Sequence, residues 1–175
     1  MKYFTPQLWI GFNSPRSKVA FATFNRRFRS YRKQLRKLLP KLNPQARGFF
    51  QNICLLHDST LLRLEVGDRI DSIPHGLKRF GIDQRRTSVR LYALSRSGDF
   101  IHMLHYKDAS RIDLNYPGKL VLFPVGAYPN FGDWGYDELT AEGENLLRHE
   151  ILFASGSTIA IEFSDFAYFR KRYRK

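Results

Sequence analysis

The stretch Leu147-Arg-His-Glu-Ile-Leu-Phe-Ala-Ser-Gly-Ser-Thr-Ile-Ala-Ile-Glu-Phe163 decides the fold class. Every second residue of a β-strand points to the same face of the sheet, and both flanks of Ser155-Gly156 alternate in this way. The residues predicted to share the apolar face are Leu147, His149, Ile151, Phe153, Ile159, Ile161 and Phe163. A Ser-Gly step between two alternating segments is typical of a hairpin turn. The stretch therefore predicts an antiparallel β-hairpin.

The length of the turn sets the register of this hairpin. A three-residue turn, residues 155–157, places Phe153 opposite Ile159 and keeps the apolar face intact, whereas a two-residue turn does not, so we predict the longer turn. The same register places Glu150 opposite Glu162. Facing like charges are unfavourable unless a cation lies between them. We therefore predict an Arg or Lys over this pair, with the basic N-terminal region as one possible source.

The same alternation recurs upstream. It covers residues 89–94, 100–106 and 112–116, with Ser97-Gly98 as a turn and a further apolar segment at 120–123. These segments predict an antiparallel sheet, or a sandwich-like or barrel-like domain, over residues 55–175.

The charge of the chain is divided unevenly. The first 57 residues contain twelve Lys and Arg and no acid, and Asp58 is the first acidic residue. From there onward 17 basic residues accompany 16 acidic ones, so the net charge of +13 divides into +12 and +1. A segment with this excess of one sign favours a negatively charged partner.

The basic segment has the pattern of an amphipathic helix. Ser14-Pro15 is typical of a helix start, and Pro40 ends the pattern. Large apolar residues recur between them at alternating steps of three and four: Phe21, Phe24, Phe28, Tyr31, Leu35 and Leu38. We expect this stripe to pack on the rest of the protein. Asn43-Pro44 repeats the start signal and predicts a second, short helix through Ile53, which would form a helical hairpin with the first.

Together these patterns predict an α+β protein. A basic helical leader, residues 1–54, packs on an antiparallel β-domain, residues 55–175, which ends in a basic tail, and the two form one compact unit. No window is apolar enough for a membrane-spanning helix, and the N-terminus lacks the apolar core of a signal peptide. A mitochondrial transit peptide is an alternative for the acid-poor N-terminus, but the apolar stripe favours a mature helix. A single cysteine fits a reducing cytoplasm.

Two interpretations compete for the basic residues. They form a solvated face, or they bind a polyanion such as RNA or DNA. Seven like charges on one helix repel one another, which favours the second interpretation. A basic segment between Ile70 and Arg86, read as a loop or short helix, and the tail from Arg170 extend the predicted site. The residues predicted to bind the polyanion are Arg26, Arg29, Arg32, Lys33, Arg36, Lys37, Lys78, Arg79, Arg85, Arg86, Arg170 and Arg172.

The sequence gives little support for catalysis. His57-Asp58 and His149-Glu150 invite a catalytic interpretation, but neighbouring residues on a strand point to opposite faces, and the same argument separates His102 from His105. Cys54 lies in an apolar run and is expected in the core. The aromatic segment 128–136 is expected to be buried, although exposed rings there would stack on bases. We predict no catalytic residues, no metal site and no cofactor.

Several short motifs resemble an uncharacterised bacterial family. They are Met1-Lys-Tyr-Phe-Thr5, Leu56-His57-Asp58, Ser97-Gly98-Asp99-Phe100, Tyr136-Asp-Glu-Leu139 and His149-Glu-Ile-Leu152. The resemblance implies a bacterial cytosolic protein with a helical N-terminal part and a C-terminal antiparallel β-domain, and it brings no established activity. This chain departs from the family because its helical part is shorter and more basic.

The function that we predict is therefore non-enzymatic binding of a polyanion, RNA or DNA. The first alternative is a protein-interaction module, of an immunity or adaptor type, that binds an acidic protein partner through the β-domain. The second is an enzyme with a dispersed site, for example His57 with Glu150. The sequence leaves the oligomeric state open.

Overall fold

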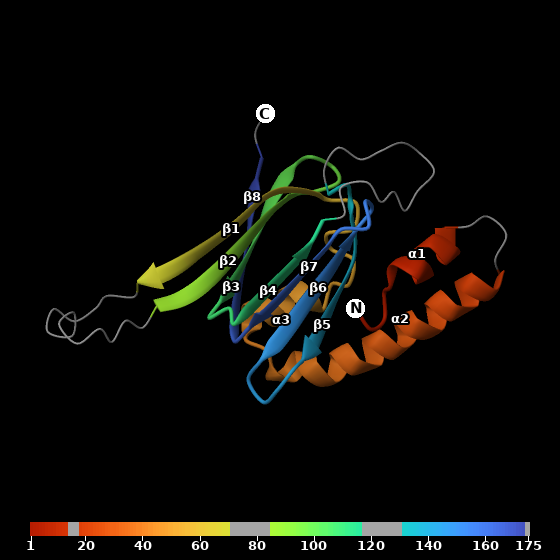
Figure 1. Ribbon diagram of the computed structural model, residues 1–175, viewed down its shortest axis with the longest axis horizontal. Helices are drawn as coiled ribbons and strands as arrows, with labels where there is room; N and C mark the ends of the chain where they lie inside the picture. The colour runs from red at the N-terminus through yellow and green to blue at the C-terminus, as the bar shows by residue number, and fades with distance from the viewer. Residues whose placement is uncertain (14–17, 71–84, 117–130, 174–175) are drawn as a thin grey trace, which may run out of the picture.

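Two antiparallel β-sheets form the body of the protein (Figure 1). The computed structural model describes residues 1–13, 18–70, 85–116 and 131–173. One sheet has the strand order β1-β2-β3-β8 and the other the order β4-β7-β6-β5. The strands are β1 (Thr60–Ile70), β2 (Arg85–Leu94), β3 (Phe100–Lys107), β4 (Arg111–Asn115), β5 (Trp134–Ala141), β6 (Leu147–Phe153), β7 (Thr158–Phe163) and β8 (Asp165–Arg172). Helices at the N-terminus complete the predicted α+β fold.

The inner faces of the two sheets form the core. The alternation predicted for residues 89–94 and 100–106 is confirmed, because Val89, Leu91 and Leu104 are fully buried. The apolar face of the β6–β7 hairpin is also buried, with Ile151, Ile159 and other members of the predicted set at 0% exposure. The segment predicted at 120–123 lies outside the described residues. Of the aromatic segment, which was expected to be buried, Trp134 is fully buried, whereas Phe131 and Tyr136 are half-buried. Residues 128–130 also lie outside the described part.

The register predicted for the β6–β7 hairpin is wrong by two residues. Ile151 pairs with Ile159, and Arg148 lies opposite Glu162. Four residues, 154–157, separate the strands, and Gly156 takes a positive φ of 84°. A shift of two residues preserves the faces of both strands, which is why the predicted apolar face is correct although the pairing is not.

The first helix was not predicted. α1 spans Pro6–Asn13, and the Leu8 N–H donates to the Thr5 hydroxyl oxygen at 3.3 Å. Thr5-Pro6 has the same signal, a capping residue followed by proline, that Asn43-Pro44 has at the start of the predicted short helix. Trp9 of α1 packs against Leu152 and Ala154 on the outer face of the second sheet.

The long basic helix is confirmed as α2, Lys18–Leu38. Its predicted start at Ser14-Pro15 lies outside the described residues. Phe24, Tyr31, Leu35 and Leu38 are buried, and Phe28 is half-buried, as the stripe predicts. Phe21 is an exception, because 55% of its surface is exposed. α2 packs on β5, where the Tyr31 hydroxyl accepts a hydrogen bond of 2.9 Å from the Leu139 N–H.

A short connection leads from α2 to the sheets. The 3-10 helix η1, Leu39–Lys41, is followed by α3, Pro44–Phe50, and Asn43 caps α3 by accepting from the Ala46 N–H at 2.8 Å. α3 ends at Phe50, three residues before the predicted end. Cys54 is exposed at a positive φ of 72°, so its predicted place in the core is wrong. The chain turns there instead of continuing as a helix.

The leader and the β-domain share one hydrophobic cluster. Tyr3, Phe4, Leu35 and Phe49 belong to the same group of buried residues as Ile151 and the other core residues of both sheets. Within the described ranges, none of the helices combines the length and the apolarity that crossing a membrane requires.

Candidate polyanion interface

The basic residues of α2 gather on the side opposite its buried stripe. At about 100° per residue, Arg26, Arg29, Lys33 and Lys37 fall within an arc of about 80° that faces away from Tyr31 and Leu35. Four basic residues therefore follow one line along about 16 Å of helix. Arg32 and Arg36 lie on the flank between this line and the stripe. All six predicted residues of the helix are exposed.

The cations of α2 are not neutralised by carboxylates of the described part of the chain. None of the ion pairs formed there involves an α2 side chain, and the Arg29 Nε donates only to the Asn25 carbonyl oxygen of its own helix, at 3.3 Å. Arg27 lies apart from the line of charges and donates to the Lys2 carbonyl oxygen at 2.9 Å. The electrostatic attraction of this surface for an anion is therefore undiminished by local partners.

Arg47 differs from the α2 residues because its guanidinium is used within the fold. It donates to the carbonyl oxygens of Leu39, Pro40 and Leu42 at 3.1–3.3 Å. These bonds satisfy the carbonyl groups at the reversal between α2 and α3, so Arg47 stabilises the bend and we do not assign it to the interface.

A groove adjoins the basic line. It has a volume of about 420 Å³ and is lined by Phe28, Arg32, Leu35, Arg36, Leu39, Gln51, Asn52 and Ile53. One wall comes from α2 and from Leu39 of η1, and the other comes from the three residues that follow α3. The helical hairpin predicted from the sequence indicates that residues after α3 lie near α2. It does not identify Gln51 and Asn52 as part of a site.

The other predicted basic residues that the structure describes lie on strands and not beside α2. Arg85 and Arg86 are strand residues of β2, paired with Ile70 and Arg69, where a loop or short helix was predicted. Lys78 and Arg79 lie outside the described residues. Arg170 and Arg172 belong to β8 and pair with β3, where a tail was predicted. In Figure 1 the end of β8 lies at the top, whereas α2 runs along the lower right.

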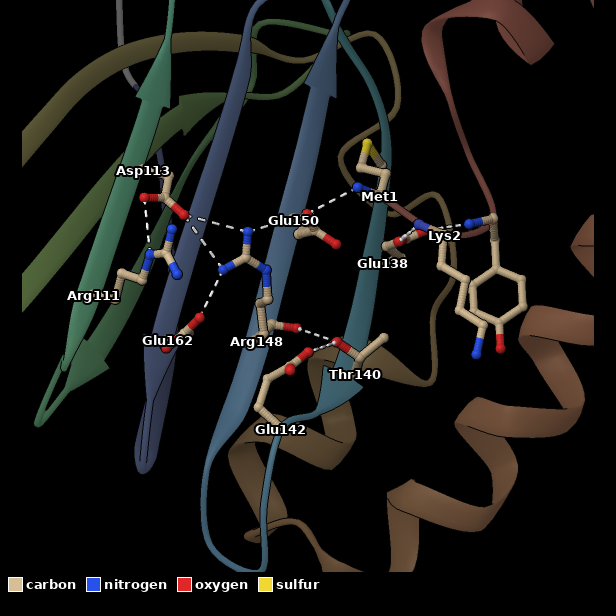
Figure 2. A network of polar contacts seen from close by, with 11 residues as sticks. Met1, Lys2, Arg111, Asp113, Glu138, Thr140, Glu142, Arg148, Glu150 and Glu162 are labelled. Carbon is tan, nitrogen blue, oxygen red and sulfur yellow. Dashed lines mark hydrogen bonds and ion pairs between the residues drawn. The ribbon is translucent and has the colours of Figure 1, made fainter.

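The predicted cation beside Glu150 and Glu162 is confirmed (Figure 2). It is Arg148 of β6, which contacts Glu162 at 2.7 Å and Glu150 at 3.3 Å. The leader contributes the Met1 amino group, 2.9 Å from Glu150. The like-charge pair directly opposite across strands is Glu138 and Glu150, not Glu150 and Glu162. Glu150 and Glu162 are therefore paired with cations that do not come from α2, namely Arg148 and the Met1 amino group.

Glu138 holds the first residues of the chain. Its fully buried carboxylate accepts from the backbone N–H groups of Lys2, Tyr3 and Phe4, the last two at 2.8 and 3.2 Å. Burial raises the pKa of Glu138, and these hydrogen bonds oppose the rise. The carboxylate therefore has a structural role beneath the start of the leader.

The histidines are dispersed. His149 is fully buried, and its Nδ1 lies 2.7 Å from the Tyr106 hydroxyl, while the His102 Nδ1 lies 2.7 Å from the Tyr168 hydroxyl. The prediction that His57 and Asp58 diverge is wrong, because they lie in a turn and not on a strand. Their Nδ1 and Oδ1 atoms are 2.9 Å apart, and Asp58 has a φ of 62°.

His57 and Glu150, the pair considered for a dispersed site, have different partners. Besides Asp58, His57 contacts the Tyr136 ring, whereas Glu150 contacts Met1 and Arg148. Among the residues that the structure describes, His, Cys, Asp and Glu do not gather in groups of three or more that would hold a metal ion.

Comparison of the chain with protein-family models, curated proteins and solved structures finds no match. The resemblance to a bacterial family stays a prediction.

Proposed function

We propose that the protein binds a polyanion, RNA or DNA, on the exposed basic face of α2, and that it does so without catalysis. The observation that carries the proposal is the line of Arg26, Arg29, Lys33 and Lys37, which is exposed and has no carboxylate partner in the described part of the chain. Contacts from Lys and Arg to phosphates supply affinity with little choice of base sequence.

The rigid attachment of α2 supports the proposal. The buried stripe and the hydrogen bond between Leu139 and Tyr31 fix the helix on β5, so its charges are held in place before a ligand arrives. A prearranged surface loses less conformational entropy on binding than a flexible basic arm does.

The test compares two triple variants of equal charge. In the first, Arg29→Gln, Lys33→Gln and Lys37→Gln remove charge from α2. In the control, Arg63→Gln, Arg96→Gln and Arg111→Gln remove charge from residues that are 61–78% exposed and paired with carboxylates. Affinity for a labelled oligonucleotide is measured by fluorescence anisotropy at about 0.15 M salt.

We expect the α2 variant to weaken binding by about tenfold to a hundredfold, as for three ion pairs of up to about 1 kcal/mol each. The control should bind nearly as the parent does. An equal loss in both variants would mean that net charge alone attracts the oligonucleotide, and it would contradict a site on α2.

A second candidate function has its own support. The β1-β2-β3-β8 sheet exposes two large apolar side chains, Leu62 of β1 by 50% and Phe169 of β8 by 49%, and Arg63 and Lys171 of the same two strands are also exposed. A mixed apolar and basic surface of this kind suits an acidic protein partner.

A pull-down after nuclease treatment distinguishes the two candidate functions. An acidic protein that is retained stoichiometrically, and lost with Leu62→Ser/Phe169→Ser but not with the α2 variant, would favour the protein-interaction function. Retention that disappears with the nuclease would favour the polyanion.

A further inference from the structure

The groove beside α2 differs from the basic line because it combines charge with an apolar wall. Phe28, Leu35, Leu39 and Ile53 supply the apolar surface, and Arg32 and Arg36 stand one helical turn apart at its edge. Of the described residues that line it, none is acidic. The ligand that such a groove fits is anionic and carries an apolar, flat or aromatic part.

The aromatic residue of the groove is held firmly. The Phe28 ring stacks on Phe24, with centroids 6.1 Å apart and an interplanar angle of 16°, and it also contacts Phe4. Because these contacts fix the ring, its orientation is set before a ligand binds. Stacking on a fixed aromatic ring is a common way to hold an unpaired base.

The opposite wall offers hydrogen-bonding groups. Asn52 donates through Nδ2 to the Gly48 carbonyl oxygen at 2.8 Å, which orients its side-chain oxygen as the remaining acceptor. Gln51 is exposed beside it. Amide side chains of this kind pair with the edges of bases, which a duplex engages in its own pairing but a single strand presents.

We propose that the groove binds an unpaired base of a single-stranded nucleic acid, with the adjoining phosphates on Arg32 and Arg36. This inference rests on the proposed function and deepens it, because it specifies the single strand as the ligand. The basic line of Arg26, Arg29, Lys33 and Lys37 contacts phosphates in either form of nucleic acid, whereas the groove is used only by a single strand.

The experiment measures the affinity of the whole chain for a labelled single strand and for the duplex of the same sequence. Two groove variants are used, Phe28→Leu, which keeps an apolar side chain but removes the aromatic face, and Gln51→Ala/Asn52→Ala. The matched control is Gln34→Ala/Gln45→Ala, since both residues are exposed amides of α2 and α3 that do not line the groove. Circular dichroism checks that each variant folds.

The parent should bind the single strand more tightly than the duplex. Phe28→Leu should lose about fivefold to a hundredfold in single-strand affinity, the range that corresponds to one stacked base, and little in duplex affinity. Gln51→Ala/Asn52→Ala should lose about fivefold, and the control should match the parent.

Failure of this inference is distinguishable from failure of the proposed function. Equal losses for single strand and duplex, or no loss in either groove variant, would overturn the groove as a base site while α2 still binds phosphates. If Phe28→Leu does not fold, Gln51→Ala/Asn52→Ala decides alone. If the α2 charge variant also leaves affinity unchanged, the proposed function itself is wrong.

Discussion

At Gly135 the backbone of β5 approaches the Trp9 indole so closely that a hydrogen atom is all that fits between them. A Cβ at this position would lie 2.0 Å from two indole carbons and 2.9 Å from the Leu152 carbonyl oxygen. The glycine is therefore required by packing, and not by its own backbone angles. It is the contact at which α1 rests on the second sheet.

Gly135→Ala should consequently displace Trp9 and lower the free energy of unfolding by about 1–3 kcal/mol, the usual cost of overpacking. The tryptophan emission should shift to longer wavelength as the indole becomes exposed. Gly48→Ala is the matched control, because nothing lies within 4 Å of a Cβ there and alanine favours the helix. A Gly135→Ala protein as stable as the parent would contradict the contact.

A second prediction at the residue scale concerns Glu138. Glu138→Ala removes the acceptor of three backbone N–H groups, so residues 2–4 should detach and stability should fall by about 2 kcal/mol or more. Amide hydrogen exchange should show lost protection at Tyr3 and Phe4.

Glu138→Gln is the informative comparison. It keeps one acceptor oxygen and avoids the cost of burying a charge, so part of the protection should remain. Unchanged exchange at Tyr3 and Phe4 in the alanine variant would show that the carboxylate does not hold this segment.

Among the elements, α3 depends on a polar connection to the start of β8. The Asn43 side chain, which caps α3, donates to the Asp165 carboxylate at 2.7 Å and to the Phe166 carbonyl oxygen at 2.9 Å. Burial raises the pKa of Asp165, but hydrogen bonds from Lys107, the Phe166 N–H and Asn43 outweigh it and hold the pKa below its ordinary value of 3.8.

Because the pKa of Asp165 is lower in the folded state, its contribution to stability is present above about pH 4 and is lost as the pH falls further. Asp165→Asn should be less stable than the parent at neutral pH by about 1 kcal/mol or less, since the carboxylate is partly exposed. Urea unfolding at several pH values measures the difference. It should shrink below pH 4, and a difference that grows on acidification would contradict the assignment.

The elements also show what could be predicted from sequence. α2 and α3 follow from local rules, namely apolar spacing and a polar cap before proline. The same rule applies at Thr5-Pro6, so α1 was predictable but was not recognised. The alternation of β2, β3, β6 and β7 fixed their buried faces correctly because a strand has a period of two.

These local rules do not predict which distant segments pair with one another. The β6–β7 register depends on the conformation of residues 154–157, and two registers that differ by two residues preserve the same apolar face. Sequence spacing gives no indication that Arg170 would join β3 or that Gln51 and Asn52 would face Arg32 and Arg36. The basic line of α2 was therefore predictable, whereas the groove beside it was not.

In the molecule as a whole, the cations fall into two groups, those paired with carboxylates and those that are not. On the outer face of the β4-β7-β6-β5 sheet, Arg111 pairs with Asp113, and Arg148 pairs with Glu150 and Glu162. The described cations of α2, by contrast, have no acidic partners in the described part of the chain. A protein that used its charges only for folding would pair them more evenly. The unpaired cations of α2 are therefore the central support for the polyanion interface.

The dependence of binding on salt tests the interface most directly, because each phosphate contact releases a counterion. Single-strand affinity is measured over a range of salt concentrations for the parent and for Arg29→Gln/Lys33→Gln/Lys37→Gln. The slope of log affinity against log salt should become shallower by about 2 in the variant, as expected for three lost contacts at about 0.7 each. The same slope in both proteins, or affinity that does not change with salt, would contradict phosphate binding by α2.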